Sequence, residues 1–144
     1  MSLFSWLRKN KPGLDAAQQQ RLAQLPKPAL LGEGSLRSQR WVVVDLETSG
    51  LNLNRDQVLS IGAVVIEDGA VDFSQMFERT LQQPNTKLSP SVLIHGLGPS
   101  AIAAGSDPAQ ALLDFMAFVG DSPLLAFHAP VSYTHLTLPT NREV

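Results

Sequence analysis

The chain has 144 residues, of which 44% are hydrophobic and 17% are charged, and its formal net charge is −2. This composition predicts one globular domain with a hydrophobic core, and it lacks the strongly basic balance of proteins that coat nucleic acids. The absence of cysteine excludes disulfide bonds and zinc–thiolate sites and is typical of a cytoplasmic protein. No run of about 20 apolar residues is present, so we expect no transmembrane span.

Residues 1–40 are expected to form an N-terminal extension and a linker. Asp15 is a residue type that commonly caps helices, and the residues after it suit a short helix that stops at Pro26. Proline and glycine residues between positions 26 and 34 favour a linker. We expect the main domain to begin at Trp41.

The main domain alternates strand and helix signals. Strands are predicted at about residues 41–47, 57–66, 70–80 and 124–127, the last of them fully buried. Asp68-Gly69 predicts a type I′ hairpin between the second and third strands. Helices are predicted at 89–96 and at 108–119, each with proline at its first turn. This order predicts an α/β fold with a mixed sheet and flanking helices.

The first predicted strand carries two carboxylates near its end. Because side chains on a strand alternate between faces, Asp45 and Glu47 share one face. Two carboxylates this close repel each other, and a hard divalent cation such as Mg²⁺ or Mn²⁺ is the usual means of holding both ionised. The pattern indicates metal-assisted cleavage of phosphodiesters. The alternative is a strand that runs into an acidic, solvated turn.

Several blocks of the sequence also resemble a known family. They are Val-Val-Asp-Leu-Glu-Thr-Ser-Gly-Leu-Asn at 43–52, then residues 56–64, 93–97, 118–121 and 125–130. In the order and spacing of these blocks, the chain resembles the DnaQ-like 3′–5′ exonucleases of the DEDD superfamily, which include the proofreading epsilon subunit of bacterial DNA polymerase III. The resemblance implies a ribonuclease-H-like fold and assigns residues 41–130 to the N-terminal part of an exonuclease domain.

The resemblance implies roles for individual residues. Asp45 and Glu47 would be catalytic ligands of two Mg²⁺ or Mn²⁺ ions. The backbone at Thr48 and Ser49, which also forms the turn after the strand, would approach the terminal nucleotide, and Leu51 would pack against its base or sugar. His95 would line the nucleotide pocket. The alternative for His95 is a favourable position at a helix C-terminus.

The resemblance stops after Pro130. Ser132 stands where the family has its third metal-binding aspartate, and no later residue matches the last motif, which supplies the general base and a fourth carboxylate. Residues 131–144 contain three threonines and Pro139 and show no helical period. We therefore expect residues 131–144 to be a tail unrelated to the family, the C-terminal part of the domain to be missing, and the chain to be a catalytically incomplete fragment.

The parent protein is expected to remove nucleotides from the 3′ end of single-stranded DNA or RNA, with a DNA polymerase subunit as a further partner implied by the resemblance. Two alternatives remain at this point. One is a non-catalytic module that binds nucleotides or a partner on the same fold. The other is an exoribonuclease similar to ribonuclease T, because the first motif does not distinguish DNA from RNA.

Overall fold

The computed structural model describes residues 14–27, 29, 35–50, 57–83 and 96–126. Its strands are β1 (Trp41–Thr48), β2 (Val58–Glu67), β3 (Ala70–Thr80) and β4 (Leu124–Ala126). Its helices are α2 (Ala16–Gln24), the 3₁₀ turn η1 (Leu36–Ser38), α4 (Pro99–Ala103) and α5 (Pro108–Val119). The predicted helix at 89–96 and the residues after 126 lie outside the described part, apart from Gly96.

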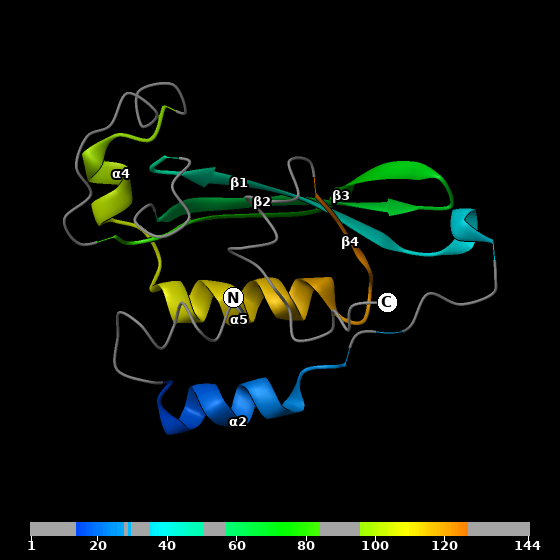
Figure 1. Ribbon diagram of the computed structural model, residues 1–144, viewed down its shortest axis with the longest axis horizontal. Coiled ribbons are helices and arrows are strands. Elements are labelled where there is room, and N and C mark those ends of the chain that lie inside the picture. Colours follow the sequence, from blue (N-terminus) through cyan, green and yellow to red (C-terminus); the bar gives the residue numbers. More distant parts are fainter. Residues whose placement is uncertain (1–13, 28, 30–34, 51–56, 84–95, 127–144) are drawn as a thin grey trace.

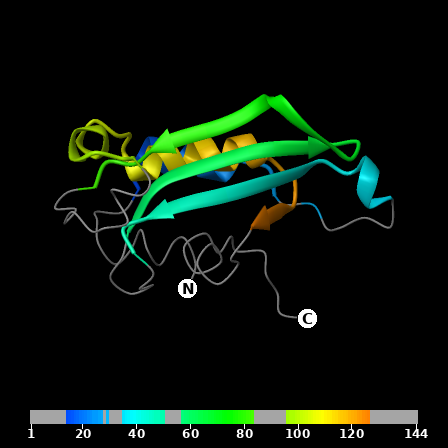
Figure 2. The same cartoon turned by 90° about the horizontal axis from the view of Figure 1, so that it is seen from above.

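The four described strands form one mixed sheet in the order β3-β2-β1-β4. Strands β1, β2 and β3 pair antiparallel, and β4 joins β1 in parallel, as Figure 2 shows. Helix α5 lies along one face of the sheet, α2 lies on the far side of α5, and α4 lies at the end opposite the β2–β3 hairpin (Figure 1). This arrangement confirms the predicted α/β class with a mixed sheet.

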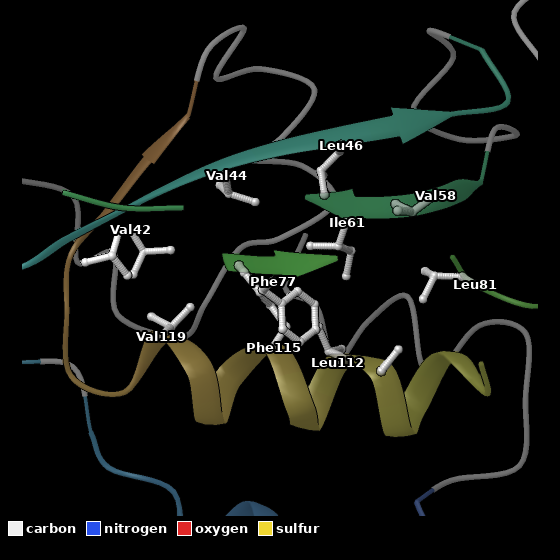
Figure 3. Packing of buried hydrophobic residues seen from close by; sticks show 12 residues of the cluster. Val42, Val44, Leu46, Val58, Ile61, Phe77, Leu81, Leu112, Phe115 and Val119 are labelled. Atoms are coloured by element: carbon white, nitrogen blue, oxygen red, sulfur yellow. The ribbon is translucent and has the colours of Figure 1, made fainter. Parts of the chain in front are cut away.

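The core lies between the sheet and α5. Along β1, the buried side chains are every second residue, which is the pattern of a strand with one face in the core. Figure 3 shows these side chains pointing toward α5. The ring of Phe115 on α5 is 1% exposed and its centroid lies 5.4 Å from that of Phe77 on β3. The rest of the cluster includes Val42, Val44, Leu46, Ile61, Val65, Leu112 and Val119.

The β2–β3 hairpin turns as predicted. Asp68 and Gly69 have φ angles of 52° and 78°, the two positive values that a type I′ turn requires. Further along β3, the register between β2 and β3 shifts. Val64 pairs with Met76, whereas Val65 pairs with Asp72. The Asp72 carboxylate accepts hydrogen bonds from the Ser74 hydroxyl at 2.6 Å and from the Gln75 amide at 2.8 Å. These bonds, that of Ser74 first, hold the pKa of Asp72 below its ordinary value.

Strand β4 was predicted to be fully buried, and this was wrong. Leu125 is 41% exposed, and β4 pairs only with β1 among the described strands. The apolar run predicted the strand correctly, but it could not predict that β4 would lie at the edge of the described sheet. An edge strand has a neighbour on one side only, so its side chains are less covered.

The first described helix packs against α5. Asp15 and Gln18 form a capping box, in which each side chain binds the other residue's backbone N–H, at 2.8 and 3.1 Å. Arg21 on α2 forms an ion pair with Asp114 on α5 at 2.7 Å. Both side chains are partly exposed, so the pair adds little stability and mainly fixes how α2 lies on α5.

Gly105 allows a close approach between the end of β3 and the loop before α5. A Cβ atom on Gly105 would lie 2.6 Å from the Leu81 carbonyl carbon and 2.7 Å from the Gln82 nitrogen. This contact accompanies the isolated bridge between Leu81 and Ser106. Both neighbouring groups are backbone, so neither can rotate away.

We expect Gly105→Ala to destabilise the chain by about 1–3 kcal/mol, the usual range for overpacking a rigid site. Urea unfolding followed by circular dichroism would measure the change. Gly62→Ala is the matched control, because a Cβ atom there meets its nearest neighbour at an ordinary 3.9 Å. If Gly105→Ala is as stable as the unmodified chain, the backbone at Leu81 and Gln82 does not restrict position 105 in the way described.

Candidate functional site

Asp45 and Glu47 lie on the sheet face that points away from α5, which we call the open face. Val44, Leu46 and Thr48, their neighbours along β1, are buried on the core side. Asp45 is exposed and Glu47 is partly buried. The shared face that strand alternation predicts is therefore present, and it is the face that the core does not use.

The strand register gives the neighbours of the two carboxylates on the open face. Paired residues in a ladder point to the same side of the sheet. Asp45 pairs with Gly62 and Glu47 pairs with Ser60 on β2. On β3, Glu78 pairs with Gly62 and Thr80 with Ser60. The row on the other side of Asp45 is apolar and consists of Leu125, Val43, Val64 and Met76.

The turn after β1 is held by hydrogen bonds of its own. The Thr48 hydroxyl donates to the Gly50 carbonyl at 2.8 Å. Ser49 N–H donates to the Gln57 carbonyl at 2.9 Å, and Gln57 N–H donates to the Ser49 hydroxyl at 3.0 Å. Thr48 is 7% exposed and faces the core. At this position the backbone, rather than the Thr48 side chain, is what the site can present to a ligand.

The structure does not describe the other residues to which the resemblance assigns a place in the site. Leu51 and His95 lie outside the described residues, as does Ser132. Their roles stay predictions. The structure thus brings Asp45 and Glu47 together on one face, with Thr48 and Ser49 directly after them in the turn.

The donor set suits a hard divalent cation. Carboxylate oxygens are the ligands that Mg²⁺ and Mn²⁺ prefer. One oxygen of Asp45 accepts a hydrogen bond from the Leu46 N–H at 3.0 Å, and a carboxylate has about four lone-pair positions, so capacity for a cation remains. Among the described residues, no group of three or more acidic, histidine or cysteine side chains is placed to hold a metal. The described part of the candidate site is therefore a pair of carboxyl groups.

Comparison with curated protein sequences gives relatives that are named as PolC-type DNA polymerase III. No family model matches the chain. The PolC-type DNA polymerase III of Thermotoga petrophila is 30% identical over 107 residues, which are 74% of this chain and 8% of that protein. The PolC-type enzyme of Staphylococcus haemolyticus is 30% identical over 95 residues, which are 65% of this chain and 6% of that protein. The chain spans less than a tenth of these curated relatives.

Solved structures match the fold. Product-bound exonuclease I superposes with a TM-score of 0.59 at 17% identity, over 68% of this chain and 24% of the other. The apo form of exonuclease I gives 0.58 at 16% identity, over 68% and 23%. The sheet, its covering helix and this superposition define an α/β protein of the ribonuclease-H-like class. Within that class, the relatives and the fold agree with the resemblance to the DnaQ-like DEDD exonucleases that the sequence blocks indicated.

One neighbour of Asp45, Gly62, was not predicted from the sequence to lie beside the carboxylates. It lies beside Asp45 on the open face, in the interior of β2. An isolated glycine inside a strand pattern was the available signal, since such glycines often mark a close approach of backbone or ligand.

Proposed function

We propose that this chain is part of a metal-dependent 3′–5′ exonuclease and that β1 supplies two of its metal-binding carboxylates. The observation that carries the proposal is the placement of Asp45 and Glu47 on the open face, while the residues that alternate with them, Val44, Leu46 and Thr48, are buried on the core side. A rigid strand holds side chains more precisely than a loop does. The pair is thus held in place before any ligand binds.

The comparisons support this function over the two alternatives. The sequence relatives are named as DNA polymerase III of the PolC type, which favours DNA over RNA as the substrate. Structural neighbours include exonuclease I, and one of these structures is a complex with an oligonucleotide. A module without catalysis, or an exoribonuclease, has no comparable support.

Asp45 and Glu47 would hold the cations. A bound Mg²⁺ or Mn²⁺ supplies Lewis-acid activation of water and charge stabilisation at the phosphodiester. The residues themselves place two carboxyl groups on one strand, whose other side is fixed by the core. The hydrogen bond from the Leu46 N–H orients the Asp45 carboxylate.

The remaining residues of the site would contact the nucleic-acid strand. In this proposal the backbone at Thr48 and Ser49, together with Leu51 and His95, contacts the nucleotide at the 3′ end. The bond between Thr48 and the Gly50 carbonyl, and the pair between Ser49 and Gln57, support a turn of fixed shape for that contact.

The proposal also divides the chain. Residues 41–130 would be the N-terminal part of the exonuclease domain, residues 1–40 an extension, and residues 131–144 a tail unrelated to it. Single-stranded DNA would be the substrate, as in a solved complex of exonuclease I. A DNA polymerase subunit would be the partner, which the names of the sequence relatives support, and the cytoplasm would be the location. No helix in the described part is long and apolar enough to cross a membrane.

The test is a Mn²⁺ titration. We expect the chain to bind Mn²⁺ weakly, with a dissociation constant on the order of 10⁻⁴–10⁻³ M, because two carboxylates provide few of the oxygen ligands that a tight site needs. Asp45→Ala should remove this binding, as measured by calorimetry and by water-proton relaxation.

Glu78→Ala is the matched control, since Glu78 is an exposed carboxylate on the same face but on β3. It should bind Mn²⁺ as the unmodified chain does. Unchanged binding in Asp45→Ala would overturn the proposed site. Micromolar or tighter affinity would show that additional residues complete it.

A further inference from the structure

Gly62 lies in the interior of β2, where glycine is normally unfavourable. A glycine inside a strand loses more conformational entropy on folding than other residues and has no side chain to pack. After Ala63, β-branched residues continue this strand, at Val64, Val65 and Ile66. A reason is therefore needed for glycine at position 62.

Neither the backbone nor the packing of the described residues provides that reason. Gly62 is absent from the glycines with positive φ, which are Gly69, Gly96 and Gly120. Among the described residues, a Cβ atom on Gly62 would find only the Asp45 carbonyl oxygen within 4 Å, at an ordinary 3.9 Å. Gly105 is different, because a Cβ atom there would lie 2.6 Å from backbone. As far as the described part of the chain is concerned, position 62 has the space and the conformation for a side chain.

The register shows what a side chain at position 62 would obstruct. Gly62 pairs with Asp45 on one side and with Glu78 on the other, so its missing side chain would project from the open face between them. Directly paired residues have Cβ atoms about 4.5–5.5 Å apart. A branched side chain at position 62 would therefore occupy the surface next to the Asp45 carboxylate.

We propose that Gly62 is a clearance residue: it keeps the surface beside Asp45 free of side-chain atoms, so that a hydrated divalent cation can reach the carboxylate across β2. This inference rests on the proposed function. Mg²⁺ and Mn²⁺ bound by one or two carboxylates keep several water molecules, so the bound species is much wider than the bare ion. Gly62 touches no reacting atom and acts by leaving room.

The inference predicts two results for Gly62→Val. A glycine that is needed only for the stability of the strand would not give both. Gly62→Val should keep or raise the thermal midpoint, because valine suits a strand better than glycine. The same variant should bind Mn²⁺ at least tenfold more weakly than the unmodified chain. Gly62→Ala should lie between the two in Mn²⁺ affinity. Circular dichroism melting and water-proton relaxation with Mn²⁺ alone measure the two properties.

Val64→Leu is the matched control, because it adds bulk on the same strand and face but one row away from Asp45. It should bind Mn²⁺ as the unmodified chain does.

If Gly62→Val keeps full Mn²⁺ affinity, the inference is overturned and the metal site at Asp45 stands. If Gly62→Val and Gly62→Ala both lower the thermal midpoint, the glycine is structural and the inference is overturned. If Asp45→Ala leaves Mn²⁺ binding unchanged, the proposed function and this inference fail together.

Discussion

Phe115→Ala is expected to lower the free energy of unfolding by about 3–5 kcal/mol, the usual range for removing a buried aromatic ring. Phe115 is 1% exposed and lies at the centre of the cluster between α5 and the sheet (Figure 3). Its ring packs against Phe77, so the truncation leaves a cavity with a second aromatic ring at its wall. Domains of this size have about 5–15 kcal/mol of stability in total. Urea unfolding by circular dichroism would measure the loss.

Phe73→Ala is the control for that experiment. It is the same substitution, but Phe73 is 75% exposed on β3, so the change should stay within about 0.5 kcal/mol. A similar loss in both variants would mean that Phe115 does not occupy the core that the structure gives it. Because β1 lies against the same cluster, Mn²⁺ binding by Phe115→Ala should follow the folded fraction and disappear with it.

Local signals predicted most of the described elements. The Asp68-Gly69 turn depends on two neighbouring residues that tolerate positive φ, and the hairpin formed where the sequence indicated. Asp107 caps α5 by accepting from the Gln110 N–H at 3.0 Å, and Pro108 follows as the first helical residue. Such signals act within one turn of chain, so a sequence is sufficient to find them. Helix α4 was missed because it is a single short turn of helix.

The parts that were not predicted depend on residues far apart in sequence. The shared face of Asp45 and Glu47 follows from alternation along one strand, so it could be predicted. The pairing of Asp45 with Gly62 depends on the register between β1 and β2, which the residues joining them do not specify in any simple way. The contact of Gly105 with the end of β3 joins residues more than twenty positions apart. The shift at Val64 joins residues closer in sequence, but it too is a property of two paired strands and not of one local segment.

Arg40→Ala is expected to lower the free energy of unfolding by about 2–4 kcal/mol, because the guanidinium makes several charge-assisted hydrogen bonds of about 1.5–3 kcal/mol each, partly offset by hydration of the freed acceptors. It donates to the carbonyls of Val119 and Phe118, both at 3.2 Å, and to the Ser122 hydroxyl at 2.7 Å. These carbonyls belong to the last turn of α5, which lacks intrahelical partners and attracts positive charge.

Arg40→Lys should recover only part of this loss, because an ammonium group cannot reproduce the planar fork that reaches several acceptors at once. Arg37→Ala is the control, since Arg37 is exposed and should change stability by less than about 0.5 kcal/mol. Full recovery by lysine would mean that charge at the helix end, rather than the fork geometry, accounts for the stabilisation. Denaturant unfolding of the three variants separates these contributions.

The effect of Arg40 on the metal site should be indirect. Arg40 precedes the first residue of β1, whereas Asp45 and Glu47 lie toward the other end of the strand and on the open face. At a temperature where Arg40→Ala is folded, its Mn²⁺ affinity should therefore equal that of the unmodified chain. A folded Arg40→Ala that binds Mn²⁺ more weakly would show that the anchoring of α5 to the start of β1 also sets the position of the carboxylates, and that the strand alone does not pre-form the site.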